Sequence, residues 1–346
     1  MMKKTLLILG LACSVFCLCQ KTEMTAAFKT KNYKEALSLG QKALENNPDD
    51  FETNLIITAS YNSLGDFQNA FLYSKKLENL AESDEQKSWA FMQLLVVHYG
   101  LGDKKTSKEY YEKAKKINAP EKAVSELAAI GKLFGFDGFY DHWNTIETEN
   151  MIFHFENSIN EEARNEIAKT RQNAFIKNNE FFKADLPKKI DFFVWGSNEI
   201  YNQFLKRSLG FTVPNYCVSH NRLNQTAGHE IAHNLSFWQG NRGKITTQFI
   251  NEGIGVCFDQ SSKDKLETAK EAYKKSPVDI KKVWAENWKI DSEILYPVSG
   301  AFVRFLINYD KTKFIELNNN QTYENAKKIY GDEIDVLIQN FTDKLK

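Results

Sequence analysis

The sequence predicts a predominantly helical α+β protein, in which an N-terminal array of helix pairs precedes a domain with a small mixed sheet and further helices. Three observations predict this class: a pattern with a period of about 34 residues in the first third of the chain, two later β-rich runs, and a His-Glu-x-x-His motif in a stretch with helical character. The 346 residues are 42% hydrophobic, which excludes a disordered chain. Because 45 Lys+Arg balance 45 Asp+Glu, bulk charge gives no reason to expect a nucleic-acid partner.

Residues 1–19 are predicted to form a signal peptide, because a basic start precedes an apolar run too short to span a bilayer. Cys17-Leu18-Cys19 offers small residues to a signal peptidase, so we expect cleavage before Gln20. The alternative is a lipid-modified Cys13, but Gly10 stands where a bulky aliphatic residue is expected. We therefore favour export to the periplasm or the medium over lipoprotein anchoring. No later stretch reaches 18 consecutive apolar residues, so no transmembrane segment is expected in the mature chain.

We predict that residues 20–137 are helical throughout, and the residue pattern of these helices repeats along the chain. Asn32-Tyr33 recurs 34 residues later as Asp66-Phe67, and Leu64-Gly65-Asp66 recurs 37 residues later as Leu101-Gly102-Asp103. This region resembles two to three tetratricopeptide (TPR) repeats. The resemblance implies an α-solenoid of stacked helix pairs.

The role of this array is left between two possibilities. Stacked repeats of this kind usually present a concave face to a protein partner, but so short an array is equally a packing platform for the next domain. The lysine-rich run from Lys104 to Lys116 carries interleaved Glu109 and Glu112, so we interpret it as a solvated helix face rather than an anion site.

The pattern then changes to that of a small α+β unit. Strand-like alternation ends the segment 145–155, and residues 190–195 form a second β-rich run. Residues 161–183 have the apolar spacing of a helix, and a further helix is expected over 198–205. Residues 211–218 are predicted to form an exposed strand beside the segment that follows.

The motif His229-Glu230-x-x-His233 is the most informative part of the chain. Asn224 or Thr226 can cap a helix here, and residues four apart share one face of a helix. Both imidazoles can therefore reach one zinc ion, while Glu230 lies beside the metal without having to bind it.

A catalytic zinc needs a third protein ligand and an open position for water. Glu252 follows His233 after 18 intervening residues, which leaves room for a loop and the start of a second, antiparallel helix. We therefore predict Glu252 as the third ligand of one zinc ion per chain. Gly253 and Gly255 are expected to let the two ligand-bearing helices approach closely, and Asn251 either supports a ligand or begins the helix.

The two histidines, Glu252 and the Asn-Glu-Gly context resemble the gluzincin metallopeptidases, most of all the aminopeptidase branch and the broader peptidase MA-like group. The segment Tyr296–Leu306 is similar to the family's Tyr-x-x-x-Gly helix, and the resemblance extends over residues 138–346. It implies a helical zinc domain in which the Tyr296 hydroxyl supports the oxyanion. The family's Gly-x-Met-Glu-Asn strand is missing, since residues 216–219 occupy its expected place. Endopeptidase and aminopeptidase action therefore both stay open.

These features predict an exported zinc metallopeptidase that hydrolyses peptide bonds, with Glu230 as the general base. The alternative is a repeat-based binding or assembly protein whose zinc site is structural or vestigial. Hydrolysis of a non-peptide amide or an epoxide is a third possibility. His220 is expected to be a surface or packing residue, and a disulfide between Cys217 and Cys257 is left open.

Overall fold

The computed structural model describes residues 21–240 and 243–346 and divides into two compact units, the first ending at Asp141 and the second spanning His142–Lys346. It is predominantly helical with one small mixed sheet of five strands, as predicted. The expected signal peptide, residues 1–19, lies outside the described residues. Among the helices of the described parts, none combines the length and the apolar character needed to cross a bilayer.

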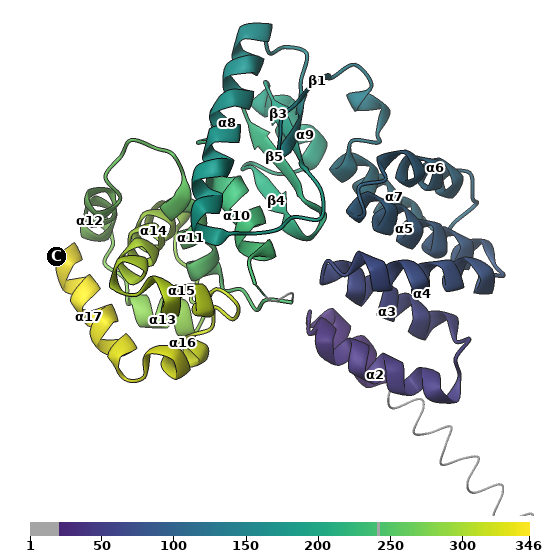
Figure 1. The fold of residues 1–346 in the computed structure, drawn as a ribbon, viewed down its shortest axis with the longest axis horizontal. Helices are drawn as coiled ribbons and strands as arrows, with labels where there is room; N and C mark the ends of the chain where they lie inside the picture. The colour runs from purple at the N-terminus through teal and green to yellow at the C-terminus, as the bar shows by residue number, and fades with distance from the viewer. Residues whose placement is uncertain (1–20, 241–242) are drawn as a thin grey trace, which may run out of the picture. The chain divides into compact units, whose positions relative to one another are not determined.

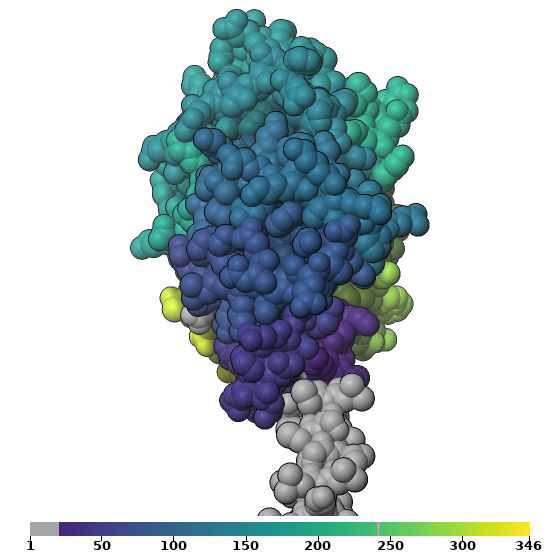
Figure 2. All heavy atoms as spheres, turned by 90° about the vertical axis from the view of Figure 1, so that its right-hand side faces the viewer, coloured from purple at the N-terminus to yellow at the C-terminus, as the bar shows by residue number. Residues whose placement is uncertain are grey.

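The first unit is a row of helices in which each helix contacts the next (Figure 1). Residues 21–29 are helical. The helices that follow are α2 (Tyr33–Asn46), α3 (Phe51–Ser63), α4 (Phe67–Leu80), α5 (Asp84–Gly100), α6 (Lys104–Lys115) and α7 (Glu121–Phe134). In addition, α3 contacts α5 and α5 contacts α7, so these three helices lie next to one another. Figure 2 shows the stacking of this unit as a steady progression of colour from purple to blue.

The turns that precede α2, α4 and α6 share one backbone conformation. Asn32, Asp66 and Asp103 have φ of −83°, −90° and −84° and ψ of 67°, 69° and 73°. Gly65 and Gly102, directly before the two aspartates, have φ of 72° and 84°, which favours glycine. Both aspartate side chains accept a backbone N–H three residues later. The spacing read from the sequence therefore corresponds to a recurring turn, while assignment to TPR repeats stays a prediction.

Small residues set how closely the helices of this unit pack. A Cβ on Gly100 of α5 would lie 2.3 Å from the ring of Phe67 in α4, and a Cβ on Gly40 of α2 would lie 2.7 Å from Ile57 of α3. Ala36 and Ala70 occupy corresponding positions of α2 and α4 and are fully buried. The core of the array thus depends on close contact between neighbours in sequence.

The second unit begins with the sheet, whose strand order is β1-β2-β3-β5-β4. The strands are β1 (Asn144–Glu147), β2 (Met151–Phe155), β3 (Ile190–Trp195), β4 (Phe211–Val213) and β5 (Val218–Arg222). The central strands β2, β3 and β5 are parallel, and the outer pairs β1–β2 and β4–β5 are antiparallel. The strand expected over 190–195 is confirmed, and the segment 145–155 contains two strands of a hairpin.

The single strand expected over 211–218 is wrong. Pro214 begins a short 3-10 turn and Cys217 has φ of 51°, so the segment turns back on itself and β5 pairs antiparallel with β4. This reversal makes β4 an edge strand of only three residues.

Helices cover both faces of this sheet. Helix α8 (Glu161–Phe182), predicted over 161–183, connects the parallel strands β2 and β3 (Figure 1). It places Arg171 over the ring of Phe192. Helix α9 (Asn198–Leu205), predicted over these residues, packs Tyr201 against Trp195 on the opposite face. Helix α10 (His229–Trp238) lies on the same face as α8, because it contacts the side chain of Thr212 in β4.

The rest of the unit is helical: α11 (Gln248–Phe258), α12 (Lys265–Lys275), α13 (Ile280–Ala285), α14 (Ser292–Tyr309), α15 (Lys311–Leu317), α16 (Tyr323–Tyr330) and α17 (Glu333–Leu345). Helices α11 and α14 approach so closely at Gly253 that a side chain there would not fit: a Cβ would lie 2.6 Å from the Ser299 carbonyl oxygen. Arg304 of α14 also donates to the Cys257 carbonyl oxygen at 2.9 Å. Gly253 therefore fits α11 against α14, whereas we expected it to fit α11 against α10.

Candidate metal centre

Helix α10 starts at the first histidine of the motif. Its N-cap is Gly228 with φ of 106°, and no side chain caps it, so the expected capping by Asn224 or Thr226 is wrong. A side chain on Gly228 would be strained in this backbone conformation and would meet the Phe258 carbonyl oxygen at 2.5 Å. The start of α10 is thus fixed by a close approach to the end of α11.

Asn178 of α8 joins these two helix ends. Its side-chain amide donates to the carbonyl oxygens of Gly228 at 3.3 Å and of Phe258 at 3.1 Å. Its own oxygen accepts from Gln260 at 3.2 Å, and its side chain is almost fully buried. One buried amide therefore ties together the N-terminal end of α10 and the C-terminal end of α11, the two helices that bear the predicted ligands.

The opposite ends of α10 and α11 are held by the segment after α15. Gln321 accepts the Thr247 backbone N–H on its side-chain oxygen and the Thr247 hydroxyl on its carbonyl oxygen, both at 3.2 Å. Asn318 donates to the Ser236 carbonyl oxygen at 3.1 Å and accepts from the Ser236 hydroxyl at 2.8 Å. Lys244 donates to the same carbonyl oxygen at 2.6 Å, and burial lowers its pKa to about 7.

The three predicted ligands converge between these supports. His229 and His233 in α10 and Glu252 in α11 each offer one ligand atom, and these atoms all lie within 4.8 Å of one another. Glu252 Oε2 lies 3.5 Å from His229 Nε2 and 3.9 Å from His233 Nε2. Ligands about 2.1 Å from a tetrahedral zinc ion are about 3.4 Å apart, so the donor set of two imidazoles and a carboxylate fits such an ion after small shifts. The glycine prediction holds at Gly255, where a Cβ would lie 2.5 Å from the His229 ring.

The ligand side chains are partly open to solvent, and the charge of each affects the pKa values of the others. Their exposed fractions are 19% for His229, 10% for His233 and 22% for Glu252. Burial alone would lower the pKa of His229, but its contact with Glu252 and the charges of the nearby carboxylates raise it. Burial alone would raise the pKa of Glu252, but the two histidines lower it. Without metal, the site thus favours a His229 imidazolium facing the Glu252 carboxylate.

His233 differs from its partner histidine. Burial and the neighbouring His229 lower its pKa, against the charges of Glu230 and Glu252 and the polar contact of Asn251. No hydrogen bond of normal geometry reaches the buried His233 Nδ1 from the residues that the structure describes. Asn251 lies in the first turn of α11, which begins at Gln248, and its side chain is among the groups that act to raise the pKa of His233.

Glu230 is buried beside the ligands and is held by β4. Its Oε2 accepts a hydrogen bond of 2.7 Å from the Thr212 hydroxyl. Tyr296 of α14 lies next to the first ligand, with its ring centroid 6.2 Å from that of His229. Burial, followed by the charges of Glu252 and Glu230, raises the pKa of Tyr296 to about 12. The phenol thus stays protonated, and can donate a hydrogen bond, throughout the neutral range.

The other sequence candidates lie in packed surroundings. His220 is fully buried, stacks on Phe193 with centroids 4.4 Å apart, and accepts from Trp195 at 3.2 Å. It is therefore a packing residue, one of its two expected roles. Cys217 and Cys257 are both free and buried, and burial raises the pKa values of their thiols to about 12 and about 11.

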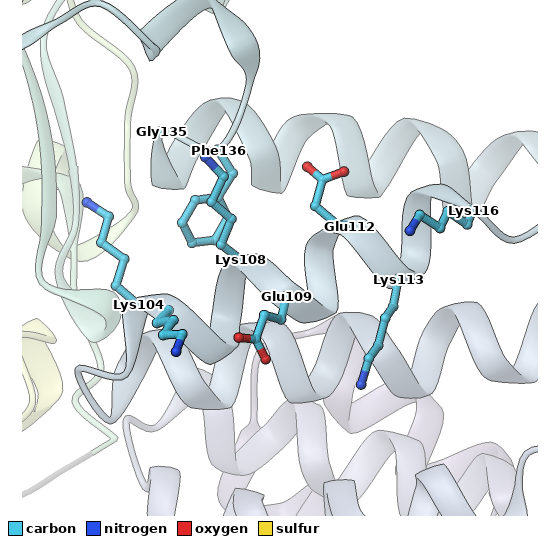
Figure 3. A pocket seen from close by; sticks show the side chains of 9 residues that line it. Lys104, Lys108, Glu109, Glu112, Lys113, Lys116, Gly135 and Phe136 are labelled. Carbon is cyan, nitrogen blue, oxygen red and sulfur yellow. The ribbon is translucent and has the colours of Figure 1, made fainter.

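The first unit contains a groove of about 590 Å³ along α6 (Figure 3). Five lysines and two glutamates line it beside Gly135 and Phe136. Both signs of charge are present, and most of these side chains are exposed, as expected of a solvated helix face.

Comparison with known proteins adds nothing to this geometry: no family model matches the chain, and no curated protein matches it. Sequence reasoning missed Thr212, Asn178, Asn318 and Gln321, which hold the site from other elements. No local motif marks these residues, and only the fold brings them to the ligands.

Proposed function

We propose that this protein is an exported zinc metallopeptidase of the gluzincin type, with TPR-like repeats before the zinc domain. The observation that carries the proposal is the convergence of His229, His233 and Glu252 beside a buried Glu230. A metal-binding set alone is common in proteins, but a carboxylate that faces the set without belonging to it is what metal-assisted hydrolysis requires.

The chain's own residues supply the acid–base steps of this proposal. A zinc ion, when bound, acts as a Lewis acid that lowers the pKa of water and polarises a carbonyl oxygen. Glu230 accepts the proton of the attacking water and returns it to the leaving nitrogen. The Tyr296 hydroxyl, kept protonated by its surroundings, donates to the developing oxyanion.

The sheet edge favours a peptide as the substrate. Strand β4 ends the sheet next to Glu230, so one side of its backbone has no neighbouring strand in the described part of the chain. An extended peptide can pair with such an edge and bring an amide bond to the site. This support applies to internal and terminal bonds alike.

The test compares wild type with Glu230→Gln on internally quenched peptides and on peptides with a free N-terminus. We expect one zinc per chain in both proteins and a loss of about 10²- to 10⁴-fold in kcat for the variant. Glu293→Gln, the same change at an exposed position of α14, is the matched control and should leave kcat unchanged.

Zinc binding without any Glu230-dependent cleavage would contradict the peptidase. That result would favour a repeat-based binding protein with a structural zinc site. Cleavage of a non-peptide amide or an epoxide alone would keep the chemistry and change the substrate class.

A further inference from the structure

We propose that Thr212 is a positioning residue, which holds one oxygen of Glu230 through a one-way chain of hydrogen bonds and leaves the other oxygen to accept the proton. This inference rests on the proposed function, because it assigns the working atom of the general base. Four side chains from three elements form the chain: Thr212 of β4, Ser219 of β5, and Glu230 and Asn234 of α10.

The distances define an unbroken sequence of bonds. The Asn234 side-chain amide lies 3.0 Å from Ser219 Oγ, which lies 2.9 Å from Thr212 Oγ1, which in turn lies 2.7 Å from Glu230 Oε2. Ser219 and Asn234 are fully buried, and Glu230 is nearly so. Thr212 itself is half-buried, so water is kept best from the bond between Ser219 and Asn234. Within the chain, each bond polarises the next.

The direction of the chain is fixed at both ends. A general base is ionised, and its carboxylate only accepts hydrogen bonds. The Thr212 hydroxyl also lies 3.2 Å from the Glu230 carbonyl oxygen, but its contact of 2.7 Å with the carboxylate is shorter and charge-assisted. Thr212 therefore donates its single proton to the carboxylate, and its oxygen accepts from Ser219. The Asn234 amide nitrogen also lies 3.1 Å from the Glu230 carbonyl oxygen, which only accepts. A reversed amide would place two oxygens against each other there, so Asn234 donates to Ser219.

This direction separates the two oxygens of Glu230. Oε2 receives the Thr212 proton in the shorter of that hydroxyl's two contacts with Glu230, so it is a poor place for a second proton. No hydrogen bond reaches Oε1 from any residue that the structure describes. In the hydrolytic step the water O–H bond breaks as its oxygen bonds to the carbonyl carbon, and the proton passes to Oε1. It then moves from Oε1 to the nitrogen as the C–N bond breaks.

The test uses Thr212→Val, which keeps the shape and removes the hydroxyl, and Thr212→Ser, which restores it. We expect kcat to fall about 10-fold in Thr212→Val with KM nearly unchanged, and to recover in Thr212→Ser. Thr145→Val, at an exposed position of the opposite edge strand β1, is the matched control. If kcat of Thr212→Val equals that of the control, the proposal is overturned.

A readout without turnover separates this proposal from the proposed function. The infrared carboxylate band of Glu230, identified by its loss in Glu230→Gln, should shift in Thr212→Val and return in Thr212→Ser. Should Thr212→Val not fold, Ser219→Ala removes the next bond and should shift the same band to a smaller extent. An unmoved band overturns the proposal even if the wild type hydrolyses no peptide, whereas an inactive wild type with a shifting band counts only against the peptidase.

Discussion

Buried polar side chains serve different purposes in the two units. In the array, Thr58 and Ser60 of α3 donate to carbonyl oxygens of their own helix, four residues earlier, and the buried Asn62 of α3 donates to Gln93 of α5, 31 residues later. In the second unit, Asn178 bonds to residues 50 and 80 positions away, and Asn318 bonds to Ser236, 82 positions away. The buried polar bonds of the array therefore stay within one helix or join nearby helices, whereas those of the second unit join segments up to 82 residues apart around one site.

The two units should therefore respond differently to substitutions. Array contacts form between neighbours in sequence, so a change there should affect the stability of that unit alone. The metal centre depends on segments that only the complete fold brings together, so changes far from it in sequence should affect metal binding. Four variants and a pH series test whether the two units differ in this way.

The largest effect is expected from the ligands themselves. His233→Ala removes one of three protein ligands, and we expect zinc affinity to fall by more than about 100-fold. This loss is larger than the loss of about 10- to 100-fold that is typical when a residue supporting a ligand is removed. Competition with a chromogenic chelator measures this affinity. Unchanged affinity would mean that zinc binds elsewhere and would remove the basis of the comparison.

Tyr296→Phe should have the next largest effect, because the loss of a hydrogen-bond donor to the oxyanion typically lowers kcat by about 10²-fold or more. Its effect should appear in kcat with zinc affinity unchanged, since phenylalanine keeps the ring beside His229 and removes only the hydroxyl. Steady-state kinetics on one quenched peptide checks this result. A change in zinc affinity instead would make Tyr296 part of the support for the ligands.

Asn178→Ala tests the long-range support directly. With the bonds to Gly228 and Phe258 lost, we expect zinc affinity to fall about 10-fold, as for other residues behind metal ligands. Thr58→Ala, which removes a hydroxyl within one array helix, is the contrasting variant and should leave zinc affinity unchanged. Equal zinc affinities in the two variants would contradict the comparison.

Gly100→Ala should lower the stability of the array and leave zinc affinity unchanged, the opposite of Asn178→Ala. Its new methyl group would clash with Phe67, so we expect the free energy of unfolding of the array to fall by about 1–3 kcal/mol. Zinc affinity should not change, because both residues belong to the first unit. Thermal unfolding followed with and without zinc separates the two units.

The pH dependence of the zinc-free protein should be the smallest effect. The raised pKa of His229 adds stability below its ordinary value of 6.5, and this stability is lost as pH rises through the raised value. The lowered pKa of Glu252 adds stability above 4.5, which is lost as pH falls through the lowered value. Stability from this pair should thus be greatest between pH 4.5 and 6.5, and zinc affinity should rise with pH as His229 loses its proton. A calorimetric pH series on wild type and Glu252→Gln checks both signs.

Local pattern was enough to predict β3, α8, α9 and the residues that converge at the metal centre. Each depends on spacing within one element or between two consecutive helices. The supports of the site were out of reach, because Thr212 lies on a strand of three residues and Gln321 lies 74 positions from Thr247. The start of α10 was missed for the same reason: Gly228 is required by the distant end of α11, and no capping side chain marks it.

A zinc titration of the chelator-treated protein, with peptide cleavage measured at each addition, tests whether the metal centre hydrolyses peptides. We expect no cleavage without zinc and a linear rise in cleavage that ends at one zinc per chain. Cleavage that persists without metal, or full zinc binding with no cleavage at any ratio, would contradict this expectation.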